Sequence, residues 1–76
     1  MPENSNLTVE KIAERIKELR IKGGYTSYRK FADEHDFEPK QYWNIEEGKS
    51  NFGIKALIKI TEIHGITMEE FFRGIE

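Results

Sequence analysis

The apolar side chains of this 76-residue chain recur at helical spacing almost throughout, and no stretch alternates with a period of two. Positions i, i+4 and i+7 fall on one face of an α-helix, and Ile12, Ile16 and Leu19 follow this spacing. There is no repeat and no internal linker. The pattern therefore predicts one all-α domain over residues 1–76, a compact bundle of five helices with short connections.

Capping residues and glycines predict where the first two helices begin and end. Thr8 suits the N-cap of the first helix, and the glycines at 23–24 suit its end. Residues 1–7 precede this cap and are mostly polar, so we expect them to be flexible. Ser27 suits the N-cap of a second helix of about nine residues.

A third, short helix is expected at about residues 39–47 and presents a polar outward face. Pro39 suits its first turn, where the missing amide would have no intrahelical partner, and Gly48 ends it. Tyr42 and Ile45 are three residues apart and are expected to face the core. The opposite side of the helix carries Lys40, Trp43, Asn44 and Glu47.

Two further helices complete the predicted bundle. The segment 53–64 is the most hydrophobic in the chain, and Gly65 supplies its C-terminal break. Thr67 and Glu70 match a capping box at the start of a last helix, which should bury Met68, Phe71 and Phe72. The fourth helix has more isoleucines than one core face needs, namely Ile58, Ile60 and Ile63. Either the last helix and the N-terminal segment cover them, or they form a dimer seam.

The second and third helices have the sequence form of a helix-turn-helix. They are joined by the tight turn 35–38, and the later helix ends in glycine. In this arrangement the later helix enters the major groove of DNA, with residues at and near its N-terminus directed at base edges.

The residues that carry a likeness to a known family are spread over all five helices: Ile16, Leu19, Arg20, Ser27, Phe31, Ala32, Tyr42, Ile45, Glu46, Gly48, Lys49, Leu57, Gly65, Ile66, Thr67 and Phe71. From about Ile12 to Phe72, this pattern resembles the Cro-like, phage-repressor-type helix-turn-helix domains of the XRE family. The resemblance implies a lambda-repressor-like bundle in which helices two and three form the helix-turn-helix. It also implies sequence-specific DNA binding and transcriptional regulation.

The resemblance implies roles for individual residues. Arg20 and Glu46 would form an ion pair that ties the first helix to the recognition helix. Lysine suits guanine acceptors, and asparagine or glutamine can bond adenine, so the expected base readers are Lys40, Gln41, Asn44 and Trp43. The expected phosphate contacts are Ser27, Tyr28, Arg29, Lys49, Ser50 and Asn51. For Arg29 an ordinary solvated helix face remains an alternative.

The sequence departs from the family pattern at several positions. Asp36 replaces the usual turn glycine, which is tolerable because aspartate visits the left-handed region more readily than most residues. His35 and His64 replace core leucines. Pro39 brings no hydrogen-bonding side chain, and Glu38 and Glu47 flank the reading surface, where they would repel phosphates.

Trp43 admits two interpretations. As a functional residue it would contact a thymine methyl group, a sugar or a partner protein. As an ordinary surface residue it would lie across Lys40 or Glu47, or be half-buried by the neighbouring loop. Single exposed apolar residues need no special cause, so the sequence leaves both interpretations open.

The composition gives no support to a catalytic or metal-binding protein. Cysteine is absent, which removes disulfides and thiolate metal sites. His35 and His64 stand at apolar positions with no HExxH pattern, and the serines lack a His-Asp constellation. We expect histidines that are hydrogen-bonded or partly buried, no enzymatic activity, no metal and no cofactor.

The N-terminus shows no charged region followed by an apolar one, and the longest unbroken aliphatic run is residues 56–58. We therefore expect no secretory signal and no membrane span, and a cytoplasmic protein.

Two hypotheses of function remain. The leading one is a transcriptional regulator whose third helix reads double-stranded DNA; because one domain buries little DNA surface, it predicts a homodimer with half-sites roughly 34 Å apart. The alternative is a protein-interaction module of the same fold, antitoxin-like or an adaptor, with a protein partner. The formal net charge of −2 favours the alternative, whereas eight bases against six acids in residues 20–60 permit a basic face.

Overall fold

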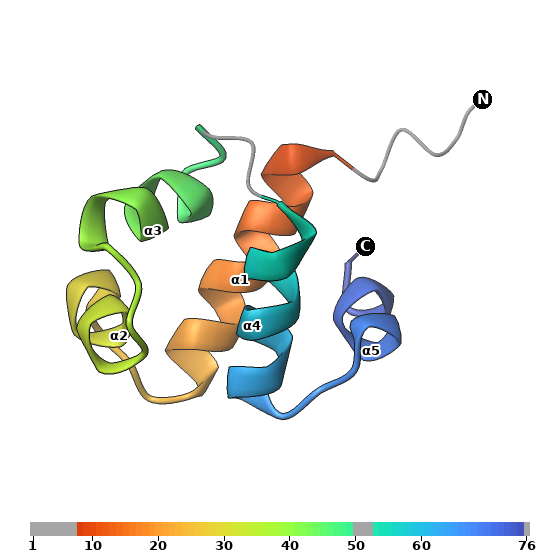
Figure 1. The fold of residues 1–76 in the computed structure, drawn as a ribbon. Coiled ribbons are helices and arrows are strands. Elements are labelled where there is room, and N and C mark those ends of the chain that lie inside the picture. The colour runs from red at the N-terminus through yellow and green to blue at the C-terminus, as the bar shows by residue number, and fades with distance from the viewer. Residues whose placement is uncertain (1–7, 50–52, 76) are drawn as a thin grey trace.

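The computed structural model describes residues 8–49 and 53–75, which form five α-helices and no strand (Figure 1). The helices are α1 (Val9–Lys22), α2 (Tyr28–Glu34), α3 (Pro39–Glu46), α4 (Ile54–His64) and α5 (Met68–Arg73). The predicted all-α bundle is confirmed. The predicted flexibility of residues 1–7 and two expected phosphate contacts, Ser50 and Asn51, fall outside the described residues. No helix within the described ranges is long and apolar enough to cross a membrane.

The predicted helix caps are present. Thr8 Oγ1 accepts a hydrogen bond from the Lys11 amide at 3.2 Å, and Ser27 caps α2 in the same way. Thr67 and Glu70 form the reciprocal capping box, with distances of 3.0 and 2.9 Å. The second helix has seven residues, shorter than the predicted nine, because the chain leaves helical geometry at His35.

Each helix contributes one fully buried large side chain to a single core. These side chains are Ile16, Phe31, Tyr42, Ile60 and Phe71, in the order of the helices. In Figure 1, α1 and α4 lie side by side at the centre, α2 and α3 on one side of them, and α5 on the other. Of the three residues predicted to be buried in the last helix, Phe71 is fully buried, whereas Met68 and Phe72 are partly buried.

The two histidines at positions where relatives are expected to have leucine pack against the ring of Phe31. His64 stacks on it almost in parallel, at 8° with 5.4 Å between ring centroids. His35 lies 4.7 Å away, and its Nε2 is 3.1 Å from the Tyr25 hydroxyl. The aromatic cluster thus fills the space of aliphatic side chains, and the prediction of partly buried histidines is confirmed.

The turn between α2 and α3 depends on a left-handed residue and on a lysine from another helix. Asp36 has φ 63°, the one positive value at a non-glycine position among the described residues. Lys59 of α4 donates a hydrogen bond from Nζ to the Asp36 carbonyl at 3.2 Å. The same ammonium lies 4.3 Å above the ring of Phe37. The turn that orients α3 is therefore fixed to α4 as well as to α2.

We predict that Asp36→Ala is less stable than Asp36→Gly by about 1 kcal/mol, because alanine has a Cβ that is strained in the left-handed region and glycine has none. Urea unfolding of the two variants measures this difference. Asp33, an exposed residue within α2, provides the matched control. There the order should reverse, since alanine is favoured over glycine in a helix by about 1 kcal/mol. The same order at both positions would contradict the role given to the turn.

We also predict a pH dependence of stability that comes from His64. Burial lowers the pKa of His64, helped by the charges of His35 and Arg15, and its Nε2 has no hydrogen-bond partner among the described residues. In the unfolded chain, the His64 imidazole takes up a proton near the ordinary pKa of 6.5. In the folded chain it does so only at lower pH, because its pKa is lowered. The free energy of unfolding should therefore fall as the pH drops through and below about 6.5.

Urea unfolding at pH 7.5 and 5.5, for the natural chain and for His64→Leu, measures this contribution. The variant should lose less stability on acidification. His35 is present in both proteins, so the difference between the two pH dependences reports His64. Equal losses would show that His64 does not cause the acid sensitivity.

Candidate nucleic-acid interface

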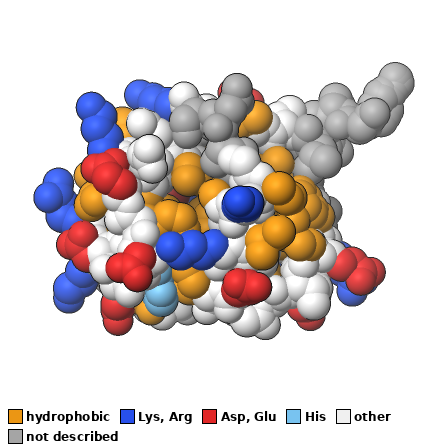
Figure 2. Space-filling view, in the orientation of Figure 1, with side chains coloured by type: hydrophobic (Ala, Val, Ile, Leu, Met, Phe, Trp, Pro, Cys, Tyr) orange, Lys and Arg blue, Asp and Glu red, His pale blue; other side chains and the backbone are white. Residues whose placement is uncertain are grey.

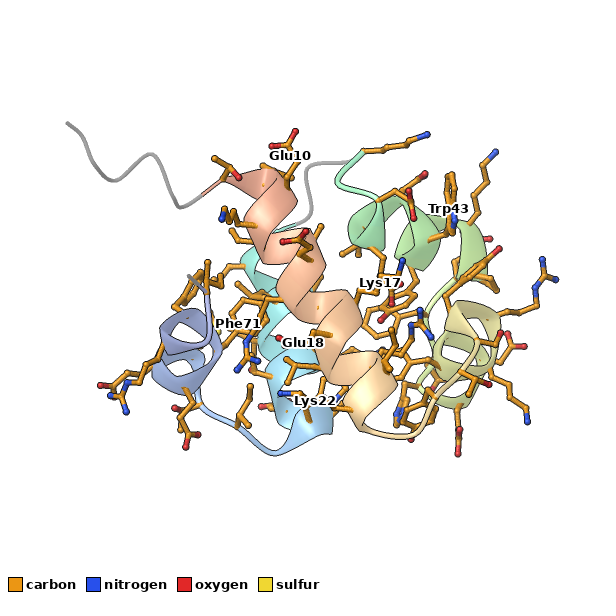
Figure 3. All side chains as sticks on the ribbon, turned by 180° about the vertical axis from the view of Figure 1, so that it is seen from behind. Glu10, Lys17, Glu18, Lys22, Trp43 and Phe71 are labelled. Carbon is orange, nitrogen blue, oxygen red and sulfur yellow. The ribbon has the colours of Figure 1, made fainter. Side chains whose placement is uncertain are left out.

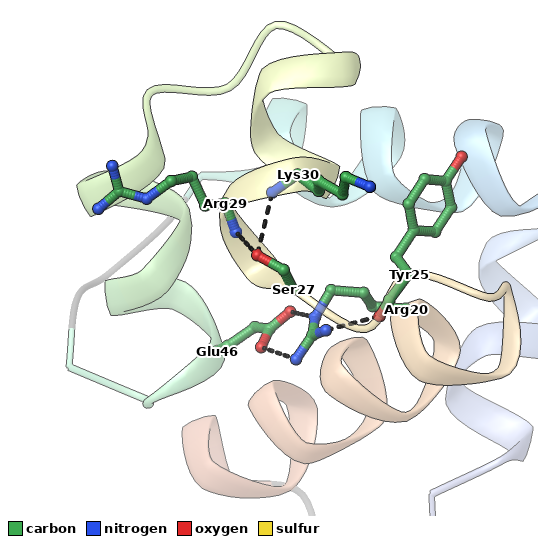
Figure 4. Close-up of polar contacts among 6 residues, drawn as sticks. All are labelled: Arg20, Tyr25, Ser27, Arg29, Lys30 and Glu46. Carbon is green, nitrogen blue, oxygen red and sulfur yellow. Dashed lines mark hydrogen bonds and ion pairs between the residues drawn. The ribbon is translucent and has the colours of Figure 1, made fainter.

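The position of α3 is fixed by a buried ion pair between the first and third helices. Arg20 donates from Nε and Nη2 to the two carboxylate oxygens of Glu46, at 2.6 and 3.2 Å (Figure 4). Its Nη1 donates to the Tyr25 carbonyl at 2.7 Å. The side chains of Arg20 and Glu46 are 6% and 3% exposed, and the hydrogen bonds to Glu46 raise the pKa of Arg20. The predicted pair is confirmed, and it also holds the loop between α1 and α2.

The inward side of α3 contains the predicted core residues. Tyr42 is fully buried and Ile45 nearly so, and burial raises the pKa of the Tyr42 hydroxyl. The opposite side bears Lys40, Trp43 and Asn44, and Gln41 is exposed in the first turn of the same helix. We call these four expected base readers the reading face. Lys40 and Gln41 are exposed, and Trp43 and Asn44 are half-buried. The structure brings all four onto one short helix.

The N-terminus of α3 already carries a carboxylate. Glu38 is the N-cap, and its Oε1 accepts a hydrogen bond from the Gln41 amide at 2.8 Å. Pro39 follows as the first helical residue. Glu38 was expected only to flank the reading surface, and glutamate is not among the preferred capping residues. The available signal was Pro39, whose preference for the first helical position makes residue 38 the cap.

The N-terminus of α2 faces the same region. Ser27 Oγ accepts hydrogen bonds from the amides of Arg29 and Lys30 at 3.1 and 3.3 Å (Figure 4). The Arg29 side chain is exposed, whereas Tyr28 is half-buried and packs against the core. Ser27, Tyr28 and Arg29 thus lie together at one helix end.

The starts of α2 and α3 enclose a surface depression, which we call the α2–α3 hollow. Its lining residues are Tyr28, Arg29, Pro39, Lys40 and Trp43. Four of these five are expected DNA contacts, two for phosphates and two for bases. The structure therefore brings together residues from separate helices that sequence analysis selected one at a time.

Lys49 makes a cation–π contact with Trp43. The Lys49 ammonium lies 5.0 Å from the centre of the indole ring. The chain reverses at Gly48, with φ 70°, and the Lys49 amide then donates to the Asn44 carbonyl at 2.9 Å. In Figure 3 the Trp43 ring stands at the outer edge of α3, away from α1. Among the ordinary contacts expected for this ring, partial burial by the neighbouring loop agrees best with the structure, because the ring is half-buried and Lys49, which follows α3, contacts it. The contact with Lys49 itself was not predicted.

A second long-range contact missed by sequence analysis fixes α5. Arg15 of α1 donates from Nε to the Phe71 carbonyl at 2.9 Å and from Nη2 to the Glu70 carbonyl at 3.3 Å. A side chain that bonds backbone carbonyls 55 and 56 residues away leaves no pattern in the sequence. Within the described part of the chain, no group of three or more histidine, aspartate or glutamate side chains is arranged to hold a metal ion.

The two-helix unit α2–α3, joined by a tight turn and packed on α1, defines the protein as a helix-turn-helix protein. Comparison with known proteins agrees: residues 13–76 match the family described as a helix-turn-helix domain, and the chain belongs to this family. A relative, the control protein C.MunI from Mycoplasma sp, is 37% identical over 62 residues, or 82% of this chain and 84% of that protein. No solved structure matches. These matches support DNA binding and transcriptional regulation as the class of function.

We predict that Arg20→Ala lowers the free energy of unfolding by about 3–5 kcal/mol, because it leaves the Glu46 carboxylate buried without its partner. Arg20→Lys should recover only part of the loss, since an ammonium cannot bond both carboxylate oxygens and the Tyr25 carbonyl in the same planar geometry. Urea unfolding measures both variants. Lys22→Ala, an exposed change at the end of the same helix, is the control and should cost less than about 0.5 kcal/mol. Equal costs for Arg20→Ala and Lys22→Ala would contradict this assignment.

Proposed function

We propose that the protein binds double-stranded DNA in a sequence-specific manner and regulates transcription, with α3 in the major groove. The observation that carries the proposal is the reading face, whose polar side chains project from a helix that a buried ion pair fixes in position. A rigid helix with an outward polar face can hold side chains in register with base edges. Membership of the helix-turn-helix family supports the same reading.

The proposed base contacts follow from the chemistry of the reading face. Lys40 suits the O6 and N7 acceptors of guanine, and Gln41 and Asn44 suit adenine, which offers a donor and an acceptor side by side. Lys40 and Gln41 belong to the first turn of α3 and are exposed, so they are the residues that can reach deepest. Asn44 lies one turn further along the helix.

The proposed phosphate contacts surround the reading face. Arg29 extends from the start of α2, and Lys49 follows the end of α3. Ser27 Oγ accepts two amide hydrogen bonds, which leaves its hydroxyl proton to donate to a phosphate oxygen. Tyr28 has a hydroxyl group that can donate as well, and Ser50 and Asn51, which follow Lys49 in the sequence, complete the proposed set.

Acidic residues limit the electrostatic attraction at this surface. Glu46 is paired with Arg20, but the Glu38 carboxylate lies at the start of α3 and Glu47 is exposed at its end. Both oppose phosphates at close range. We therefore propose that base contacts carry a larger share of affinity here than in a strongly basic domain, and that salt weakens binding less steeply.

The proposal includes a homodimer. Two isoleucines one turn apart on α4, Ile54 and Ile58, are 61% and 41% exposed, whereas Ile60 is fully buried and Ile63 partly buried. Figure 2 shows hydrophobic side chains gathered over α4 and toward α5, on the side of the molecule away from α2. A second copy covering Ile54 and Ile58 would leave both reading faces free. Two-fold symmetry then places the half-sites roughly 34 Å apart.

A protein-interaction module remains the second candidate, because the same exposed isoleucines suit a different protein equally well. Selection of duplexes from a randomised pool, at two salt concentrations, separates the two candidates. A DNA reader enriches a motif, and its affinity falls with salt as phosphate contacts release counterions. Absence of an enriched motif at both salt concentrations would reject the DNA-binding proposal.

We predict different effects for a substitution at a proposed base contact and a substitution at a proposed phosphate contact. Asn44→Ala should relax preference at one base position, at a cost of about 1–3 kcal/mol for the preferred base. Lys49→Ala should weaken binding to all duplexes alike and reduce the dependence on salt. Fluorescence anisotropy with the selected site and its single-base variants measures both effects.

Arg73→Ala is the control for charge in this experiment. It removes one positive charge from α5, which lies on the other side of the α1 and α4 pair from α3 (Figure 1). Its binding should match that of the natural chain. Unchanged binding for both Asn44→Ala and Lys49→Ala would reject the proposed docking of α3.

A further inference from the structure

Trp43 occupies an unusual place on the reading face. It is a large aromatic residue on the outward side of α3, yet it is half-buried and its ring lines the α2–α3 hollow. Lys49, which follows the C-terminal end of α3, lies over the ring. The residues that line the hollow together with Trp43 lie at the starts of α2 and α3. The indole therefore contacts Lys49 and forms one wall of the hollow.

The lining of the hollow combines apolar surface with the side chains of two cations. Trp43, Pro39 and the ring of Tyr28 contribute carbon surface, and the exposed side chains of Arg29 and Lys40 contribute the charges. A long basic side chain keeps its charged end in water, so its stem adds to the apolar surface. The ligand that fits has a small apolar group next to a polar or anionic one.

A phosphate alone matches this hollow less well than such a ligand. Helix N-termini bind phosphate through free backbone amides. Here the amides of Arg29 and Lys30 already donate to Ser27, the Gln41 amide donates to the Glu38 carboxylate, and Pro39 has no amide. The Glu38 carboxylate also stands at the start of α3 and opposes an anion there.

The major-groove edge of DNA presents one apolar group, the methyl group at C5 of thymine. A methyl group at C5 of cytosine occupies the same position on the base. We propose that the α2–α3 hollow receives the C5 methyl group of a pyrimidine and that Trp43 determines this specificity. The inference rests on the proposed docking of α3 in the major groove. Arg29 and Lys40 then lie beside the phosphate and base edges next to the methyl group.

The test begins from a duplex that the full chain selects from a randomised pool. Each thymine in the site is replaced in turn by deoxyuridine, which lacks only the methyl group. Burial of one methyl group corresponds to roughly four-fold in affinity, so one replacement should weaken binding by about that factor. In Trp43→Ala, the duplexes with thymine and with deoxyuridine at that position should bind equally.

A second set of duplexes distinguishes the two sources of the methyl group. Cytosine and 5-methylcytosine are placed in turn at the sensitive position. Recovery of affinity with 5-methylcytosine, absent in Trp43→Ala, shows that the hollow reads the methyl group itself. A loss that only thymine restores shows that the hollow reads thymine and requires its O4 acceptor as well. Both results support the methyl contact, and they assign it to different bases.

Two further variants separate the loss of the methyl contact from a general loss of folding or binding. Trp43→Phe keeps an aromatic wall and should retain part of the thymine preference, whereas Arg73→Ala on α5 should retain all of it. If the chain selects a motif but no deoxyuridine replacement weakens binding, or the weakening persists in Trp43→Ala, this inference is wrong and the DNA-binding proposal stands. If no motif is selected, both are wrong.

Discussion

The Arg20 and Glu46 ion pair is the interaction on which the arrangement of this molecule depends. It joins α1 to the last turn of α3, and the third Arg20 hydrogen bond holds the loop before α2. Taking two charges out of water is costly, and the cost is offset by the attraction between the two charges and by the three hydrogen bonds that Arg20 donates to Glu46 and to the Tyr25 carbonyl. The pair specifies one orientation of α3, since any rotation of that helix would leave both charges buried and unpaired. A short helix of eight residues has little stability of its own, so this external fixation matters.

A second set of contacts holds α3 at its other end. Lys59 bonds the carbonyl of Asp36 and covers Phe37, so the turn before α3 rests on α4. Phe37 in turn packs on Phe31 and Tyr42 within the aromatic cluster. Fixed at its start by the turn and at its end by the ion pair, α3 can present its outward residues in one geometry. Binding of DNA would then not have to order this helix, so no free energy of binding would be lost to its ordering.

Local features were predictable from the sequence because their causes are local. The caps at Thr8, Ser27 and Thr67 depend on residues within three positions, and the helical faces depend on spacing. The ion pair was expected through the family resemblance rather than from the residues themselves. The contacts made by Lys59 and Arg15 bring together residues 23 and about 55 positions apart, and no spacing rule connects them. The Lys49 contact with Trp43 depends on the left-handed turn at Gly48. The direction in which this turn sends the Lys49 side chain cannot be read from the sequence.

The distribution of acids explains why an aromatic residue belongs on this reading face. With a net charge of −2 and carboxylates at both ends of α3, the surface cannot rely on long-range attraction alone. In the proposed docking, contacts that act only at short range would then carry the recognition: hydrogen bonds from Gln41 and Asn44, and apolar contact from Trp43. Apolar contact is unaffected by Glu38 and Glu47, whereas every phosphate contact nearby is weakened by them. An apolar contact made by Trp43, as proposed, would therefore add binding free energy that the carboxylates at the two ends of α3 do not reduce.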